Sequence, residues 1–252
     1  TVTITPIVDG EVTVDVDANS ALDVATNQNT ASNQIKTIYD VTVPVVEIDT
    51  TVPNNTNISS FNIIVMFSED VTGFNSGDIS FVNATISNFT AINAKNYSAT
   101  ITAISEGDIT VDVNANVAID VANNQNTAAT QLKTNYDATK TSLTISSSVA
   151  NPANSEFTAS FNFTEVVQGF ESSDVTLSNA TISNFNTTDN KTFTALITPI
   201  ADGDVTVNVN ADVAQDVATN KNTAATEFKV SYDGTKPTKP VISAISDYTC
   251  SG

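Results

Sequence analysis

The chain has 252 residues, of which 28 are acidic and nine basic, and its formal net charge is −19. Such an excess of negative charge repels phosphate groups and argues against a nucleic acid or an anionic lipid surface as a partner. The sequence contains no apolar run of the roughly 20 residues that a membrane-spanning helix needs, so we expect no direct insertion into a membrane.

The sequence lacks histidine and arginine, and its single cysteine is Cys250. No disulfide within the chain and no zinc site built from several cysteines can therefore form. No serine or cysteine lies beside a plausible base that could activate it as a nucleophile. Paired carboxylates, which some glycosidases use, recur in every repeat without any sign of an aromatic pocket. We expect no enzymatic activity.

The sequence repeats itself at a fixed spacing. The segments ITPIVDGEVTVDV, ITAISEGDITVDV and ITPIADGDVTVNV begin at Ile4, Ile101 and Ile197, so the spacing is 97 and then 96 residues. A second block, which ends in NATISNF, begins at Phe67 and again at Phe163. A fixed period indicates one structural unit copied in tandem, and a unit of this length can bury its own core.

Alternating apolar and polar residues predict β-strands, because successive side chains on a strand point to opposite faces of the sheet. In the second unit the predicted strands are, in chain order, 43–50, 59–67, 78–82, 84–91, 95–103, 108–114 and 130–136. Residues 115–129 are predicted to form a long loop. Hairpin turns, in which glycine supplies the positive φ, are predicted at Asp9-Gly10, Glu106-Gly107 and Asp202-Gly203.

About seven antiparallel strands per unit predict an all-β fold of tandem immunoglobulin-like β-sandwiches. The predicted domains are 1–40, the C-terminal part of an Ig-like domain whose remainder is missing; 41–137 and 138–235, two Ig-like domains; and 236–252, a linker and the start of a further module. The linkers between units are short, and two of the three contain proline, so neighbouring domains should be joined semi-rigidly. Neighbouring Ig-like domains of the same chain are the first expected partners.

The repeat carries an ordered set of motifs, which include F-S/T-E-x-V-x-G-F, N-A-T-I-S-N-F, D-V-A-x-N-x-N-T-A and a closing Y-D. In this order they resemble the bacterial Ig-like domains found in tandem in very large surface adhesins, and the resemblance covers nearly all of 1–237. It implies a secreted or cell-surface protein in which such modules form a stalk that presents a distal binding domain. The sequence departs from the pattern at Val166, where the second unit has Asp70, and at Thr141, where the other linkers have proline.

Acidic and amide side chains are expected to gather at one end of each sandwich. In the immunoglobulin topology the B–C and F–G loops share an end, near the point where the chain enters from the previous domain. Carboxylate and amide oxygens are the ligands that Ca²⁺ prefers, and extracellular modules bind it with a Kd of about 10⁻⁴–10⁻³ M. Ca²⁺ would bridge like charges and stiffen the junction. The predicted metal ligands are Asp40, Glu69, Asp120 and Asn126 for the second unit, and Asp137, Glu165, Asp216 and Asn222 for the third.

The same residues have a second interpretation, which the sequence leaves open. Asp and Asn cap turns in long loops because their side chains bond to nearby backbone amides. Their recurrence in both full units preserves turn chemistry as well as it preserves metal ligands. Calcium binding and turn structure alone are therefore two alternatives.

The function that we expect is that of a non-catalytic spacer in a secreted or surface-anchored bacterial adhesin. The array would extend a distal binding domain, and host or surface glycans and proteins would be bound by domains outside this segment. Two other classes remain. One sandwich could itself bind a glycan, ice or a protein ligand, or the repeats could be accessory domains of a secreted hydrolase or a motility-surface protein.

Overall fold

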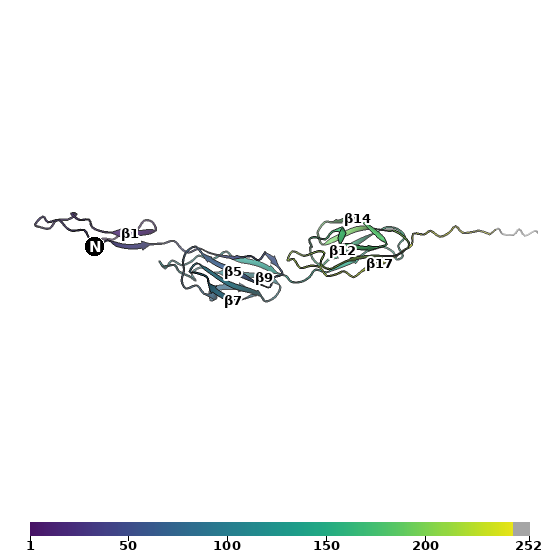
Figure 1. Ribbon diagram of the computed structural model, residues 1–252, viewed down its shortest axis with the longest axis horizontal. Coiled ribbons are helices and arrows are strands. Elements are labelled where there is room, and N and C mark those ends of the chain that lie inside the picture. The colour runs from purple at the N-terminus through teal and green to yellow at the C-terminus, as the bar shows by residue number, and fades with distance from the viewer. Residues whose placement is uncertain (244–252) are drawn as a thin grey trace, which may run out of the picture. The chain divides into compact units, whose positions relative to one another are not determined.

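The computed structural model describes residues 1–243, which divide into two compact units at the boundary between Ala138 and Thr139 (Figure 1). Their regular structure is almost entirely β. Among residues 1–243 there is no helix with the length and hydrophobicity needed to cross a membrane. Residues 236–243 of the predicted linker form no strand, and Cys250, with the rest of the predicted further module, lies outside the described residues.

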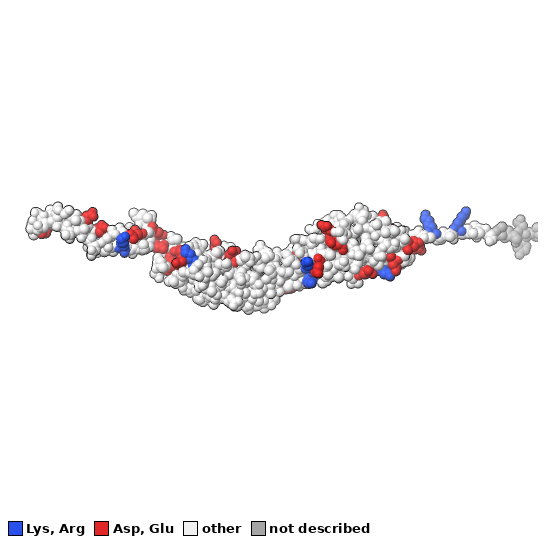
Figure 2. All heavy atoms as spheres, viewed as in Figure 1, with Lys and Arg blue, Asp and Glu red and all other residues white. Residues whose placement is uncertain are grey.

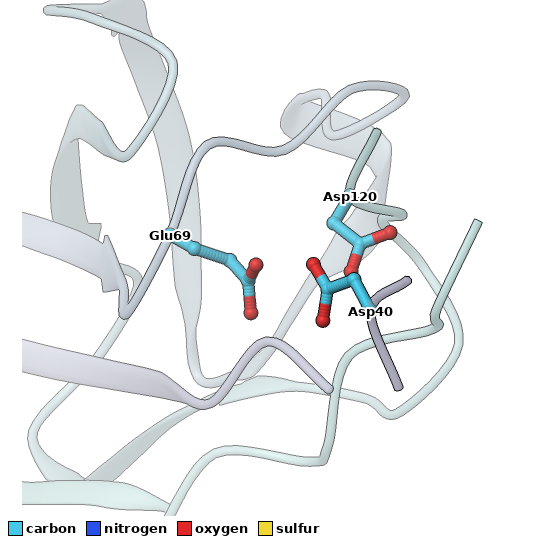
Figure 3. Close-up of side chains that lie close together, drawn as sticks. All are labelled: Asp40, Glu69 and Asp120. Atoms are coloured by element: carbon cyan, nitrogen blue, oxygen red, sulfur yellow. The ribbon is translucent and has the colours of Figure 1, made fainter. Parts of the chain in front are cut away.

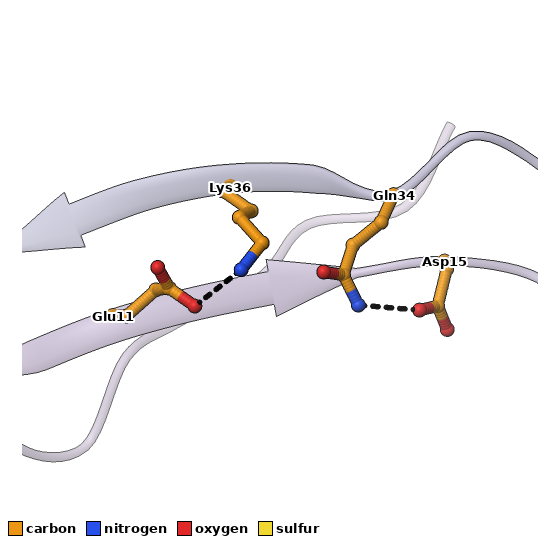
Figure 4. Close-up of polar contacts among 4 residues, drawn as sticks. All are labelled: Glu11, Asp15, Gln34 and Lys36. Carbon is orange, nitrogen blue, oxygen red and sulfur yellow. Dashed lines mark hydrogen bonds and ion pairs between the residues drawn. The ribbon is translucent and has the colours of Figure 1, made fainter.

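The first unit begins with a hairpin of two antiparallel strands, β1 (Gly10–Val14) and β2 (Ile35–Tyr39). Two polar pairs join its strands on one face (Figure 4). Lys36 Nζ lies 2.9 Å from Glu11 Oε1, and Gln34 Nε2 donates to Asp15 Oδ2 at 2.8 Å. These contacts are exposed, so they add little to stability and mainly define how the two strands face each other.

The hairpin leaves apolar side chains in solvent that the other repeats bury. Val16 is 53% exposed, whereas its counterparts Val113 and Val209 are 1% and 0% exposed. Ile35 of β2 is also exposed, whereas its counterparts Leu132 and Phe228 pack against the cores of the full repeats. The hairpin therefore has the hydrophobic pattern of a sandwich strand pair without the opposing sheet that would cover it.

Two four-stranded sheets form the sandwich of the first unit. One sheet has the strand order β3 (Val46–Thr50), β5 (Ser60–Phe67), β8 (Asn96–Ala103), β7 (Ala84–Ala91). The other has the order β4 (Asn55–Thr56), β10 (Leu132–Tyr136), β9 (Gly107–Val113), β6 (Ile79–Val82). With the seven longer strands lettered A to G in chain order, the sheets read A-B-E-D and C-F-G, which is the constant-type immunoglobulin arrangement. The predicted fold is confirmed.

Local details differ from the sequence-based expectation. Strand β4 pairs with β10 in parallel, not antiparallel, and this pairing carries the segment after β3 onto the opposite sheet. A short 3₁₀ turn, η1 (Ser76–Asp78), precedes β6. The Asn75 side chain accepts a hydrogen bond from the Gly77 amide, and Asp78 accepts one from the Asn75 amide, so the turn is capped at both positions.

The inward faces of both sheets supply the core of the first unit. Alternate residues of the central strands are fully buried, among them Ile63, Ile101 and Val111, each 0% exposed. An aromatic group closes one end, where the rings of Phe74 and Tyr97 lie 4.9 Å apart in an edge-to-face arrangement. The predicted alternation of the strands is therefore satisfied by one contiguous core.

The second unit repeats this architecture with its own core. One sheet has the order β11 (Leu143–Ser146), β12 (Phe157–Phe163), β15 (Thr192–Pro199), β14 (Ala180–Thr187). The other has the order β13 (Val175–Ser178), β16 (Gly203–Val209), β17 (Phe228–Tyr232), and the 3₁₀ turn η2 (Ser172–Asp174) precedes β13. A parallel bridge between Ala153 and Tyr232 takes the place of the β4–β10 pair. Each full repeat thus folds around side chains of its own sequence.

Candidate metal centre

Three carboxylates from separate segments meet at one end of the first unit's sandwich. Asp40 precedes β3, Glu69 lies in the loop between β5 and β6, and Asp120 lies in the loop between β9 and β10. Each offers an oxygen within 4.8 Å of the other two, and Figure 3 shows the side chains grouped closely. Two oxygens that each bind one Ca²⁺ ion at about 2.4 Å can be at most about 4.8 Å apart, so the spacing fits a shared cation.

Asp120 is placed by the loop that contains it. It is 2% exposed, its Oδ1 accepts hydrogen bonds from the amides of Ala122 and Asn124 at 2.8 Å, and its Oδ2 accepts one from Asn124 Nδ2 at 2.8 Å. Burial by itself raises the pKa of Asp120, but the hydrogen bonds from Asn124 and the loop amides outweigh burial, so the pKa lies below its ordinary value. Asp120 is therefore a fixed negative charge at neutral pH.

Asp23 in the N-terminal segment and Asp216 in the second unit accept the same set of hydrogen bonds, although Asp23 is exposed and Asp216 is buried. Each accepts two backbone amides at one oxygen and an asparagine side-chain amide at the other. The motif D-V-A-x-N therefore folds into the same closed turn in all three copies. This aspartate therefore stabilises the turn, although the turn leaves part of the carboxylate's capacity unused, because a carboxylate can accept about four hydrogen bonds.

Asn126 and Asn222, also predicted as metal ligands, brace the loop from within. Asn126 is 2% exposed, and its Oδ1 accepts hydrogen bonds from Val117 and Ala118 at 2.9 and 2.8 Å. Its Nδ2 donates to the carbonyls of Asn114 and Thr127 at 3.0 and 2.7 Å. Asn222 makes the equivalent four bonds. Both lone pairs of each amide oxygen are occupied, so these bonds favour a role in the turn over a role as metal ligand.

Like charges face one another at Glu69. Burial raises the pKa of the Glu69 carboxyl, and the negative charges of Asp120 and Asp40 raise it further. Lys95 acts in the opposite direction, and its Nζ donates to the carbonyl of Ser68 at 3.2 Å. Ionisation of Glu69 is therefore unfavourable, and the attraction of a bound divalent cation would offset this repulsion.

Asp9 belongs to the same acidic region, although the sequence predicts only a hairpin turn for it. Its charge also raises the pKa of Glu69. Its Oδ1 accepts a hydrogen bond from the Val41 amide at 3.1 Å, and its Oδ2 accepts one from Thr42 Oγ1 at 2.6 Å. Asp9 thus holds the segment that follows Asp40. The sequence feature that could have identified Asp9 is the acidic residue at the same position of the other two repeats, Glu106 and Asp202.

The two other turns have the corresponding contacts. Glu106 Oε1 accepts a hydrogen bond from the Ala138 amide at 3.0 Å, and Asp202 Oδ1 accepts one from the Gly234 amide at 2.7 Å. The Thr235 hydroxyl donates to Asp202 Oδ2. The turns at Glu106-Gly107 and Asp202-Gly203 are not hairpins as predicted, because β8 and β9, and likewise β15 and β16, belong to different sheets. In every copy the acidic residue before the glycine fastens the chain that leaves the repeat. We refer to these contacts as exit ties.

The second predicted set is described unit by unit. Asp137 lies at the end of the first unit, where its amide donates to the Thr56 carbonyl at 2.9 Å. In the second unit Glu165 lies between β12 and β13, and Asp216, 1% exposed, lies between β16 and β17. Carboxylate oxygens of Glu165 and Asp216 lie within 4.8 Å of each other. The second unit thus reproduces the pairing of Glu69 with Asp120.

Acidic side chains are spread over the visible face of the molecule with few basic ones among them (Figure 2). Three exposed ion pairs, Lys36–Glu11, Lys133–Asp108 and Lys229–Asp204, involve the same position of each repeat. None of these lysines belongs to the carboxylate cluster. The cluster is therefore an anionic site composed of hard oxygen donors, and the chemistry that it offers is binding of a divalent cation.

The match to a protein-family model agrees with the fold. A family model described as a bacterial Ig-like domain matches residues 40–136 and 137–232. No curated protein matches the chain. Similar solved structures include invasin, a bacterial integrin-binding protein (15% identity, TM-score 0.43, 90% of this chain and 53% of that one). Another is InvD of Yersinia pseudotuberculosis (16% identity, TM-score 0.38, 83% of this chain and 66% of that one). A third is a tetra-tandem repeat from the extending region of a large adhesion protein (20% identity, TM-score 0.34, 90% of this chain and 58% of that one). The chain spans about half to two thirds of the length of these structures.

Proposed function

Because the chain belongs to the bacterial Ig-like domain family, we propose that it is a non-catalytic spacer segment of a bacterial adhesin. The tandem arrangement of two sandwiches, each with its own core, is the observation that carries this proposal. The number of modules then sets the length of the spacer, and the binding activity belongs to a domain elsewhere in the protein. The proposed location is the bacterial cell surface.

The composition supports this role. The net charge of −19 keeps a long array soluble and prevents copies from associating through their sheets. The residues that recur between repeats stabilise loops, as Asn126 does, or form the exit ties, as Asp202 does. They do not converge on one asymmetric site. A spacer needs this kind of repetition, whereas an enzyme needs a unique constellation.

We further propose that β1 and β2 are the last two strands of another sandwich, whose remaining strands pack on the exposed face of Val16 and Ile35. The support is the contrast with Val113 and Val209, which occupy the same repeat position as Val16 and are buried. A two-stranded hairpin alone is marginally stable in water.

Ca²⁺ is the proposed ligand of Asp40, Glu69 and Asp120. Three converging carboxylates and the raised pKa of Glu69 support it. An ion there would hold Asp40, at the exit of the N-terminal hairpin, against two loops of the following sandwich. It would thereby stiffen the connection that Asn124 and Asp9 already restrain. The calcium proposal extends to Asp137, Glu165 and Asp216 only because these residues occupy the same positions of the next repeat.

Single-molecule stretching of the chain tests the spacer role. A load-bearing array should give two separate unfolding events, each releasing roughly 30 nm for about 96 residues at about 3.5 Å per residue less the folded length. Ile197→Ala, which empties a fully buried position of the second unit, should weaken one event and leave the other unchanged. A single event for the whole chain would contradict modular folding.

A further inference from the structure

The second unit contains a recess that the spacer role does not use. It has a volume of about 420 Å³ and lies between the β12–β13 loop, the end of β14 and the loop that follows β14. The lining includes Gln168, Phe170, Phe185, Asn190 and Phe193. This volume is within the usual range of about 300–1,000 Å³ for small-molecule sites.

Three aromatic rings form the apolar part of the recess. Phe170 and Phe193 are 6% and 4% exposed, whereas Phe185 is half-buried and so retains accessible ring surface. The rings of Phe185 and Phe193 are stacked with centroids 5.6 Å apart, and Phe170 meets Phe185 edge to face at 5.5 Å. These contacts hold Phe185 in place as a rigid apolar platform.

Three amide side chains, those of Gln168, Asn186 and Asn190, form the polar part. Their backbones are held by hydrogen bonds or strand pairing: Gln168 exchanges two hydrogen bonds with Gln215, at 2.7 and 3.1 Å, and the carbonyl of Asn190 accepts one from Val167 at 2.8 Å. The three side-chain amides are exposed and make no hydrogen bond within residues 1–243. Each can donate two hydrogen bonds and accept two, which is what a hydroxyl-bearing ligand requires.

Comparison with the first unit singles out these amides. The positions of Gln168, Asn186 and Asn190 are occupied there by Thr72, Thr90 and Ala94, none of which has an amide side chain. The aromatic residues next to them recur, since Phe74 and Phe89 correspond to Phe170 and Phe185. Three differences between repeats therefore converge on one recess.

We propose that this recess binds an uncharged saccharide, with one pyranose ring against Phe185 and its hydroxyls bonded to the three amides. No charged side chain lines the recess, although the chain as a whole carries a net charge of −19. A cationic ligand would find no carboxylate there and an anionic ligand would find no lysine. The combination of an apolar platform and neutral groups that both donate and accept matches a sugar ring, which has an apolar C–H face and hydroxyls at its edge.

Nuclear magnetic resonance of the full chain provides the test, because side-chain NH₂ signals of asparagine and glutamine report directly on the three amides. The probes are the methyl glycosides of glucose, galactose, mannose and N-acetylglucosamine, and an array of neutral oligosaccharides. At least one neutral sugar should give saturable shifts at Gln168, Asn186 and Asn190, with a dissociation constant on the order of 1 mM for a single ring. N-Acetylneuraminic acid and cyclohexanol are the anionic and apolar comparison ligands.

The matched control is the triple variant Gln168→Thr, Asn186→Thr, Asn190→Ala, which gives the second unit the residues of the first. All three positions are exposed, so its melting temperature should fall by no more than a few degrees, the cost of alanine at the positive φ of Asn190, while binding falls by about tenfold or more. Failure of every neutral sugar and oligosaccharide to bind would overturn the proposal. So would equal binding by the triple variant, or a preference for cyclohexanol or N-acetylneuraminic acid.

Discussion

Asn124 donates a side-chain hydrogen bond to the main-chain carbonyl of Asp40 at 3.1 Å, across 84 residues of sequence. The same amide group also donates to Asp120, so one side chain joins two members of the carboxylate cluster. The loop between β9 and β10 and the segment before β3 are therefore positioned together before any ion binds. Such preorganisation lowers the entropic cost of assembling a metal site.

Ca²⁺ should stabilise the first unit, and the effect should depend on the cluster. At a concentration ten times the dissociation constant, binding contributes about 1.4 kcal/mol, which raises the melting temperature of a domain of this size by about 6–10 °C. Asp40→Asn and Glu69→Gln should each remove the shift, and Glu47→Gln, which neutralises an exposed acid of β3, should retain it. Calorimetry in Ca²⁺ and in EGTA gives the measurement. An identical melting curve in both would contradict the calcium proposal.

Without metal, Glu69→Gln should make the first unit more stable at neutral pH. The folded-state pKa of Glu69 is raised above its ordinary value of 4.5, so ionisation penalises the folded state at high pH. The penalty disappears as the pH falls through the folded pKa toward 4.5. We expect a gain of about 0.5 kcal/mol, or roughly 2–4 °C, at pH 7 in EGTA. The difference between the wild-type and variant melting temperatures should shrink near pH 4.5; a variant less stable at pH 7 would show that repulsion is not the dominant effect.

The exit tie of the second unit should weaken in acid. Hydrogen bonds from the Thr235 hydroxyl and the Gly234 amide lower the pKa of Asp202 below its ordinary value of 3.8. Its contribution is therefore complete above pH 3.8 and is lost as the pH falls through the lower folded value. The protection factor of the Gly234 amide, which compares its hydrogen exchange with that of an unstructured peptide at the same pH, should fall in that range, and in Asp202→Asn it should be low at every pH. A carboxyl of Asp202 that titrates at or above 3.8 would contradict the tie.

Residues 1–40 should be unfolded when they are expressed alone. The valines that the other repeats bury have no covering sheet in the hairpin, and two strands rarely hold together in water. Circular dichroism and thermal melting give the measurement, with residues 41–137 as the folded comparison. A cooperative melting transition of the 1–40 peptide would show that this segment is a domain of its own.

The strands were predictable because each run alternates at period two, and Gly107 and Gly203 mark where β9 and β16 begin. Topology also followed, since seven such strands in order lead to the Ig-like arrangement that places Asp40, Glu69 and Asp120 at one end. The parallel β4–β10 pair was not predictable, because two residues are too short for a periodic signal and Thr56 is buried by tertiary contact.

The candidate site was harder to predict in detail. Recurrence of Asn126 and Asp120 could not separate ligands from turn residues, because both roles select the same oxygen-bearing side chains. The four hydrogen bonds of Asn126 distinguish them, and these depend on backbone groups up to 12 residues away. The place of Asp9 beside the cluster was missed because its contact with Thr42 spans 33 residues and a turn was sufficient to explain its presence in the sequence.

The shared register of β1, β9 and β16 has a consequence during synthesis. Val12, Ile109 and Val205 occupy the same position of the repeat. The strands that precede β9 or β16, which form the front half of a repeat, could therefore pack against the last two strands, the closing hairpin, of another repeat. Exchange of this kind is a characteristic misfolding route of tandem arrays. Emergence from the ribosome in sequence order limits it, because each front half meets its own hairpin first. Drift between neighbouring copies, such as the change from Tyr97 to Phe193, then makes a foreign hairpin fit less well than the native one.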